Sequence, residues 1–284
     1  MGQHYVPQRY LQNFEDPTRS GFVWMFRKPP DNPRQLPIAS VAQASRFYDN
    51  AVEIQLANEI EGPANPVIQK LCAEQSINPE ERQNLSRYIA VMLKRVPFSR
   101  QKGLEMLPAV LDETIAKIRA PLIAARVDSS ADKTLVNLTI AEVDAVYEKF
   151  KLEPPSNIIE QLRTPWASPE MVNLIDAMAW RVVKASGPSF FLTSDNPAFF
   201  FGAYGLKSEE AELTFPLSSY WALHGCWQGN RGDLRFLPVN QKLVKEVNRR
   251  VTSTTSQFAF YNARETWVHK LLTSPNPLLS RIIW

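Results

Sequence analysis

The hydrophobic pattern divides the chain into a helical middle and strand-like ends. Apolar residues recur at helical spacing over most of 51–127, and again in 139–150 and 168–185. The stretch 21–28 and several stretches after residue 187 are rich in β-branched and aromatic residues, as in strands, and 35–40 is a candidate partner for 21–28. The pattern predicts an α+β fold, with a helical middle section packed on a mainly antiparallel sheet built from N- and C-terminal strands.

Three helix starts have local signals. Residues 78–81 (Asn-Pro-Glu-Glu) combine an N-cap, proline at the first helical position and carboxylates near the positive end of the dipole. Ser-Pro opens a second helix, predicted to run over 168–185. Thr139 and Glu142 stand in capping-box register and predict a third start at residue 139.

The length of 284 residues fits a single domain over 1–284. The most polar break is 128–137 (DSSADKTLVN), which would serve as a linker. It gives a possible subdivision into 1–127, with the N-terminal arm, a hairpin and the helical part, and 138–284, with a helix and a mixed α/β part.

Composition and charge are those of an ordinary globular protein, with 44% hydrophobic and 21% charged residues. The net charge of +3 permits a nucleic-acid partner without arguing for one. The nearest basic cluster, Arg249 and Arg250, is predicted to be the solvated face of a helix.

The location in the cell is predicted to be the cytoplasm, with no membrane partner. Cys72 and Cys226 are far apart and form no disulfide framework or zinc motif. The chain shows no secretory leader pattern and no apolar run of the roughly 18–20 residues that span a bilayer.

The stretch FFLTSDNPAFF (190–200) places polar residues at the end of a hydrophobic strand, where side chains are held firmly yet stay accessible. Asp195 is a candidate base or metal ligand, Asn196 a candidate for orienting a substrate, and Ser194 a substrate-binding candidate. The competing interpretation is turn chemistry, in which Asp195 caps backbone amides.

The opening arm, MGQHYVPQRYLQNF, contains one of only three histidines in the chain. Imidazole titrates near neutral pH and binds metals, so His4 is a candidate general base or metal ligand. Structural packing explains the arm equally well, because large and polar residues alternate along it. Tyr5, Gln8 and Tyr10 are candidate substrate-binding residues.

Two further charged residues complete the candidate site. Glu61 lies at an interruption in a helical pattern and is a candidate second metal ligand, or a solvated surface group. Arg95 precedes Val-Pro at a helix end, where it would clamp a phosphate or pair with Glu61 or Asp195.

Familiar enzyme motifs are missing from the sequence. Ser218 and His224 lie close together, but no Gly-x-Ser-x-Gly elbow accompanies them, so a serine hydrolase is not favoured. Ser218 remains a substrate-binding candidate. The sequence contains no P-loop, dinucleotide fingerprint, His-Glu-x-x-His or EF-hand loop.

Four of these stretches together resemble the domain-of-unknown-function family 4238: HYVPQRYLQNF, LKRVPFSR, FLTSDNP and FPLSSYWALHG. The resemblance spans about residues 3–262. Its motif positions correspond to His4, Pro7, Tyr10, Leu11, Phe14, Arg95, Pro97, Ser194, Asp195, Asn196, Pro197, Pro216, Leu217 and Ser218. The family carries no established activity, so the resemblance indicates which residues matter but not what they do.

Two hypotheses follow. The first is a metal-dependent hydrolase, nuclease- or phosphodiesterase-like, acting on nucleic acid or a nucleotide. His4 would be its base, Asp195 and Glu61 would hold Mg²⁺ or Mn²⁺, and Arg95 would stabilise phosphate charge.

The alternative is a non-enzymatic ligand- or protein-binding or sensing module. In this hypothesis the polar motifs form a structural network, and Trp24, Trp221 and Trp227 line a groove. An accessory role in bacteria is a further hypothesis.

Overall fold

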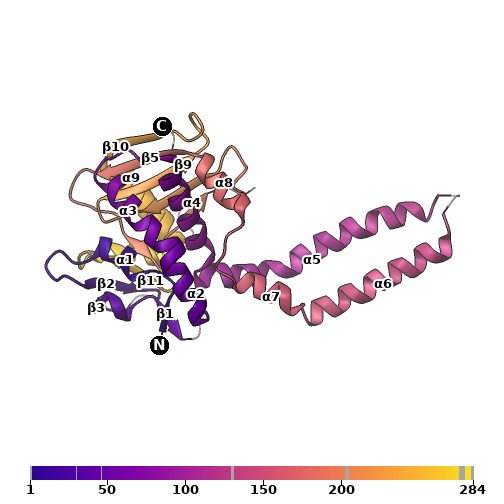
Figure 1. Ribbon diagram of the computed structural model, residues 1–284. Helices are drawn as coiled ribbons and strands as arrows, with labels where there is room; N and C mark the ends of the chain where they lie inside the picture. The colour runs from indigo at the N-terminus through magenta and orange to yellow at the C-terminus, as the bar shows by residue number, and fades with distance from the viewer. Residues whose placement is uncertain are drawn as a thin grey trace. The chain divides into compact units, whose positions relative to one another are not determined.

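The structure is a computed structural model that describes residues 2–29, 31–45, 47–128, 131–201, 205–274 and 279–282. The chain forms two compact units (Figure 1). Unit 1 comprises residues 1–98 and 165–284, and unit 2 comprises residues 99–164. The predicted linker 128–137 does not coincide with these boundaries. Its described part lies in unit 2, ahead of and within a helix.

Unit 1 contains all the described strands and most of the helices. Its strands are β1 (Gly2–His4), β2 (Phe22–Arg27), β3 (Arg34–Pro37), β4 (Gln43–Ser45), β5 (Ala179–Ala185), β6 (Thr193–Ser194), β7 (Phe199–Phe201), β8 (Glu212–Pro216), β9 (Trp221–Cys226), β10 (Leu234–Val239) and β11 (Phe258–Tyr261). Its helices are α1 (Gln8–Leu11), α2 (Asn50–Gln55), α3 (Gly62–Cys72), α4 (Pro79–Lys94), α8 (Pro169–Ala177), α9 (Gln241–Ser253) and α10 (Thr266–Thr273).

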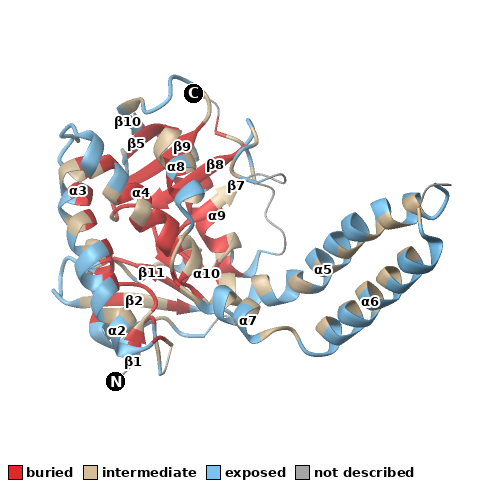
Figure 2. Ribbon diagram, turned by 45° about the vertical axis from the view of Figure 1, so that its right-hand side comes forward, coloured by how far each residue is buried: buried red, intermediate tan, exposed pale blue. Residues whose placement is uncertain are grey.

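A five-stranded sheet in the order β10-β5-β9-β8-β7 is buried on both faces, as Figure 2 shows. Its pairs are antiparallel except for β10 and β5. Neighbouring residues of β5 point to opposite faces: Val182 packs in one cluster with α3, α4 and α8, and Val183 packs in another with α9. Helices α3, α4 and α8 therefore cover one face of this sheet.

A second, four-stranded sheet in the order β3-β2-β11-β6 joins the two ends of the chain. In its centre Phe260 of β11 lies opposite Met25 on one side and Thr193 on the other, in antiparallel register. Helix α10 packs against this sheet through Val268 and Leu272. The α+β fold and the pairing of N- with C-terminal strands are thus confirmed.

Local signals fixed the start of α4. The Asn78 side chain accepts the Glu81 amide at 2.9 Å, and the Glu81 carboxylate accepts the Asn78 amide at 2.9 Å. Pro79 stands at the first helical position. The predicted N-cap is confirmed, and the Glu81 side chain completes a capping box that was not predicted.

The predicted helix over 168–185 is half wrong. Ser168 caps α8 as expected, but the helix ends at Ala177, and β5 begins at Ala179. Met178 leaves the helix with ψ 149°. The segment Trp-Arg-Val-Val that follows packs between two sheet neighbours, where β-branched and aromatic side chains fit well.

Unit 2 contains α5 (Pro97–Ala125, which begins at the end of unit 1), α6 (Lys133–Leu152) and α7 (Ser156–Arg163). The predicted start at Thr139 is wrong: Asp132 caps α6 by accepting the amides of Thr134 and Leu135. None of the described residues of these helices is fully buried. No helix in the described ranges is both long and apolar enough to cross a bilayer.

Candidate functional site

Arg95 holds the N-terminal arm onto the helical part of unit 1. It follows α4 directly, and its side chain is completely buried. The guanidinium donates to Glu61 Oε1 at 2.6 Å and to the main-chain carbonyl of His4 at 2.5 Å. The Tyr48 hydroxyl donates to the Arg95 carbonyl at 2.6 Å. A buried guanidinium needs a matched charge and matched acceptors, so these contacts tie three distant segments together.

Glu61 belongs to the interruption seen in the sequence, which is a π-helical turn over Leu56–Glu61. Gly62 follows, and a Cβ at that position would lie 3.2 Å from the carbonyl oxygen of Ala57. The Glu61 side chain is 18% exposed, so the ion pair with Arg95 touches solvent only from the Glu61 side. Single π turns recur at functional sites, which makes this turn a feature of interest beside Arg95.

Two buried polar atoms beside this ion pair have no hydrogen-bond partner among the described residues: the Tyr88 hydroxyl and Arg95 Nε. Burial raises the pKa of Tyr88 well above its usual value. Glu61 and Tyr10 raise this pKa further, and Arg95 opposes them. An unpaired buried hydroxyl costs free energy. The Tyr88 hydroxyl and Arg95 Nε are therefore the groups of this region that could still form a hydrogen bond.

The His4 imidazole takes little part in this arrangement. Its Nε2 lies 3.2 Å from the carbonyl oxygen of Ala39, and the ring is partly exposed. Within the described residues, no hydrogen bond or ion pair joins the ring to Glu61, Arg95 or Asp195. The structure brings His4 to Arg95 through the main chain alone.

Asp195 organises a turn. It follows β6, is 2% exposed, and its carboxylate accepts the amides of Ser256, Gln257 and Phe258 at 2.9, 2.6 and 3.0 Å. Burial raises the pKa of this carboxyl to about 6, and the three amide hydrogen bonds offset the effect only in part. Asp195 thereby holds the connection between α9 and β11.

Ser194 and Asn196 also bind backbone. The Ser194 hydroxyl donates to the Asn196 carbonyl at 2.9 Å and accepts the Asn196 amide at 3.0 Å. The Asn196 side chain donates to the carbonyl of Thr254 at 3.1 Å. The Ser-Asp-Asn stretch is thus directed at main-chain groups of the neighbouring turn.

Tyr10 joins the arm to both sheets. Its hydroxyl donates to the Pro216 carbonyl at 2.7 Å and lies 2.9 Å from Thr193 Oγ1, while its ring stacks on Phe215. Tyr5 is buried nearby: burial, and then the charge of Asp195, raises its pKa. Tyr10 therefore ties the arm to Thr193 of β6 and to the end of β8.

The other two substrate-binding candidates lie apart from these contacts. Gln8 is exposed on α1. Ser218 is half-buried, and its hydroxyl accepts the Tyr220 amide at 3.2 Å and lies 3.9 Å from Cys72 Sγ.

The metal-binding prediction rested on Glu61 and Asp195. In the described part of the chain, no group of three or more His, Cys, Asp or Glu side chains is placed to hold a metal ion. The Glu61 carboxylate accepts from Arg95, and the Asp195 carboxylate accepts three amides. The two carboxylates therefore do not belong to such a group.

Sequence reasoning missed a second buried charge cluster, centred on Glu212 of β8. Its carboxylate lies 3.1 Å from His224 Nε2 and accepts from Arg250 at 2.7 Å, from Arg281 Nε at 3.1 Å and from the Ile282 amide at 3.0 Å. Burial alone would raise the pKa of Glu212, but the bonds from His224, Ile282 and Arg250 lower it to about 2. Burial lowers the pKa of His224. The cluster anchors the described C-terminal residues onto β8.

The prediction that Arg250 lies on a solvated helix face is wrong. Arg249 is 47% exposed, but the Arg250 side chain is completely buried beneath the rings of Phe199 and Phe201. The available signal was its spacing from Val247, which places both residues on the apolar face of α9.

A family model described as "Protein of unknown function (DUF4238)" matches residues 2–265. No match was found among curated proteins or among solved structures. The matched range includes the arm, Arg95, the Asp195 turn and β8 with its neighbour β9. Because the match covers nearly the whole chain, the protein belongs to this family of unknown function.

Proposed function

We propose that this protein is a ligand-binding module in which the polar motif residues serve as a structural network rather than as catalysts. The observation that supports this function most directly is the set of hydrogen bonds that the Asp195 carboxylate accepts. All three amides of Ser256–Phe258 point at its carboxylate. A carboxylate surrounded in this way holds a turn and has little capacity left for a substrate.

The contacts of Arg95 support the same function. Its Nη atoms are engaged by Glu61 and by the carbonyl of His4. With its Nη atoms so engaged, a fully buried guanidinium ties the arm in place and does not clamp a phosphate from solvent.

The first test compares two aspartates of different environment. Asp195→Ala leaves three buried amides without their acceptor, and we expect it to lower the free energy of unfolding by at least about 2 kcal/mol. Asp49→Ala is the control, because Asp49 is exposed and its side chain makes no cap hydrogen bond. Urea denaturation followed by tryptophan fluorescence measures both.

A metal-dependent hydrolase of nucleic acid or nucleotides is the second candidate function. One observation favours it: the pKa of Asp195 is raised to about 6, close to the range useful for a general base. DNA, RNA and nucleotides would be incubated with the protein and Mg²⁺ or Mn²⁺. Hydrolysis abolished by Asp195→Asn and His4→Gln, with stability unchanged, would establish the hydrolase and refute the structural network.

A further inference from the structure

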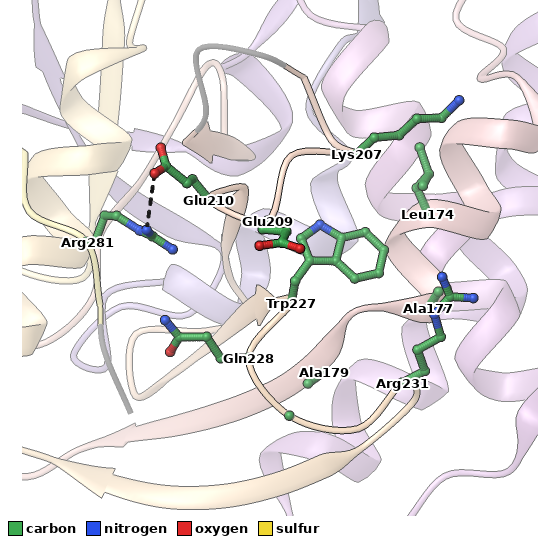
Figure 3. Close-up of a pocket in the computed structure, with 11 residues that line it drawn as sticks. Leu174, Ala177, Ala179, Lys207, Glu209, Glu210, Trp227, Gln228, Arg231 and Arg281 are labelled. Atoms are coloured by element: carbon green, nitrogen blue, oxygen red, sulfur yellow. Dashed lines mark ion pairs between the residues drawn. The ribbon is translucent and has the colours of Figure 1, made fainter.

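One cavity in unit 1 lies away from all the motif residues. Its volume is about 940 Å³, within the range of small-molecule sites. It is lined by the turn after β9, by the end of α8 and by Lys207, Glu209 and Glu210. Figure 3 shows the Trp227 ring inside it, with Arg281 and Glu210 on one side and Arg231 on the other.

The turn that carries Trp227 is tightly held. The indole Nε1 donates to the Leu206 carbonyl at 2.8 Å, which fixes the ring. Gly229 has φ +117°, and a Cβ there would approach the Arg181 guanidinium to 2.8 Å. Arg181 is buried beneath the turn and donates to the Gln228 carbonyl at 3.2 Å. The aromatic surface is therefore preorganised, which lowers the entropy lost on binding.

Two cations on the wall of the cavity retain free donors. Arg281 Nε donates to the Glu212 carboxylate, which orients the guanidinium. The Nη atoms of Arg281 make no hydrogen bond to any described residue. Arg281 Nη1 lies 3.9 Å from Glu210 Oε1. Arg231 is exposed and has no ion pair within the described ranges. Lys207 differs, because it pairs with Glu170 at 2.6 Å.

The acidic residues of the cavity limit which anionic ligands it can bind. Glu209 and Glu210 line the same space, so a bare anion such as inorganic phosphate would meet repulsion. A ligand that carries hydroxyl groups next to its anionic group would donate to these carboxylates, as ribose hydroxyls do to acidic residues elsewhere. Its aromatic part would stack on Trp227.

We propose that this cavity binds a nucleoside monophosphate, with the base on Trp227, the phosphate on Arg231, and the ribose hydroxyls facing Glu209 and Glu210. The inference rests on the proposed binding function and names its site and ligand class. It needs no bond to be made or broken.

The test is calorimetric titration of the full chain with adenosine, guanosine, cytidine and uridine 5′-monophosphates. At least one should bind with a Kd below about 1 mM. The matching nucleoside should bind at least about tenfold more weakly, because it lacks the anion, and inorganic phosphate alone should not bind.

Variants separate this site from binding elsewhere. Arg231→Ala should weaken nucleotide binding about tenfold, whereas Arg235→Ala should not, because Arg235 lies outside the cavity and pairs with Asp233. Trp227→Leu should abolish the stacking contribution, and Trp227→Phe should retain most of it. Melting temperatures identify any variant that fails to fold. Because Arg231 is exposed and has no ion pair among the described residues, Arg231→Ala should disturb the fold least.

The inference is overturned if none of the nucleotides binds at millimolar concentration, if Arg231→Ala and Arg235→Ala bind alike, or if inorganic phosphate binds as tightly as the nucleotide. Failure of the proposed function has a different signature. A nucleotide that binds at Trp227 and is then hydrolysed in an Asp195-dependent reaction refutes the non-enzymatic function and leaves the binding site standing.

Discussion

The guanidinium of Arg95 donates to the main-chain carbonyl of His4, at 2.5 Å, and the imidazole of His4 faces the carbonyl of Ala39 instead. Any residue at position 4 supplies the same carbonyl. The side chain of His4 and the side chain of Arg95 should therefore differ sharply in their importance for stability.

Arg95→Ala should lower the free energy of unfolding by about 3–5 kcal/mol, because it leaves Glu61 without its buried partner. His4→Ala should cost about 1 kcal/mol or less, since it removes one partly exposed hydrogen bond. Urea denaturation measures both, with Arg264→Ala as the control for loss of an exposed arginine. Equal costs for the two substitutions would contradict this account of the arm.

Tyr10→Phe tests the link between the arm and the two sheets. The substitution keeps the ring on Phe215 but removes the donor to the Pro216 carbonyl, which is buried. We expect a loss of about 1–3 kcal/mol. Tyr220→Phe is the matched control, since Tyr220 is 48% exposed, and it should leave the urea midpoint unchanged. A midpoint for Tyr10→Phe equal to that of the wild type would argue against an anchored arm.

Asp195 should produce a characteristic dependence of stability on pH. Its pKa in the folded state is raised to about 6, above the value near 3.8 of an ordinary aspartate. The folded state therefore binds more protons between these values, and stability from this group falls as pH rises from about 4 to 6. The fall is at most about 3 kcal/mol, from two pKa units at 1.4 kcal/mol each.

The measurement is the difference in unfolding free energy between wild type and Asp195→Asn, taken from pH 4 to pH 7. Asparagine has the same shape and does not titrate, so the difference isolates the Asp195 carboxyl. As pH rises to about 6, the wild type should lose stability relative to Asp195→Asn, and above pH 6 the difference should stay constant. A difference that is flat, or that grows with pH, would show that the pKa is not raised.

Glu212→Gln should disrupt the second cluster. The substitution removes the carboxylate nearest to the buried Arg250 and leaves only Glu246, at 3.6 Å, and we expect a loss of about 3 kcal/mol. Because the pKa of Glu212 is lowered to about 2, its contribution is complete above about pH 4.5 and is lost as pH falls toward 2.

The same substitution should release the C-terminal residues. Ile282 and Arg281 both donate to Glu212, so carboxypeptidase should remove residues from the C-terminus faster in Glu212→Gln than in the wild type. Glu210→Gln is the control, because Glu210 is 66% exposed and pairs with Arg281 only at the long distance of 3.9 Å. Identical digestion rates for the three proteins would show that Glu212 does not anchor the C-terminal residues.

Unit 1 should fold without residues 99–164. None of those residues belongs to the buried core clusters of the described chain, and the Arg100 side chain donates to the Arg163 carbonyl at 2.8 Å, so the two ends of the segment lie close together. A chain with a short Gly-Ser linker in place of 99–164 should keep a cooperative thermal transition and near-ultraviolet circular dichroism. A molten, non-cooperative product would mean that unit 2 is required for the fold.

The sequence by itself determined the features whose causes lie within a few residues. The capping box of Asn78 and Glu81 and the N-cap Ser168 depend on neighbours in the chain. It also indicated the α+β class and the pairing of terminal strands, because apolar periodicity records which faces are buried. Asp195 as a turn residue was one of two readings of its motif, and the sequence left the choice open.

The tertiary structure decided everything that depends on partners far along the chain. Residues after Met178 form a strand because two strands flank them, against their own helical spacing. Arg250 is buried because Glu212, 38 residues earlier, supplies its charge. Arg95 meets His4 across 91 residues and through the backbone, a contact that side-chain identity does not encode. Such pairings are set by packing of the whole unit, since burial of a charge is stable only where the fold brings its partner.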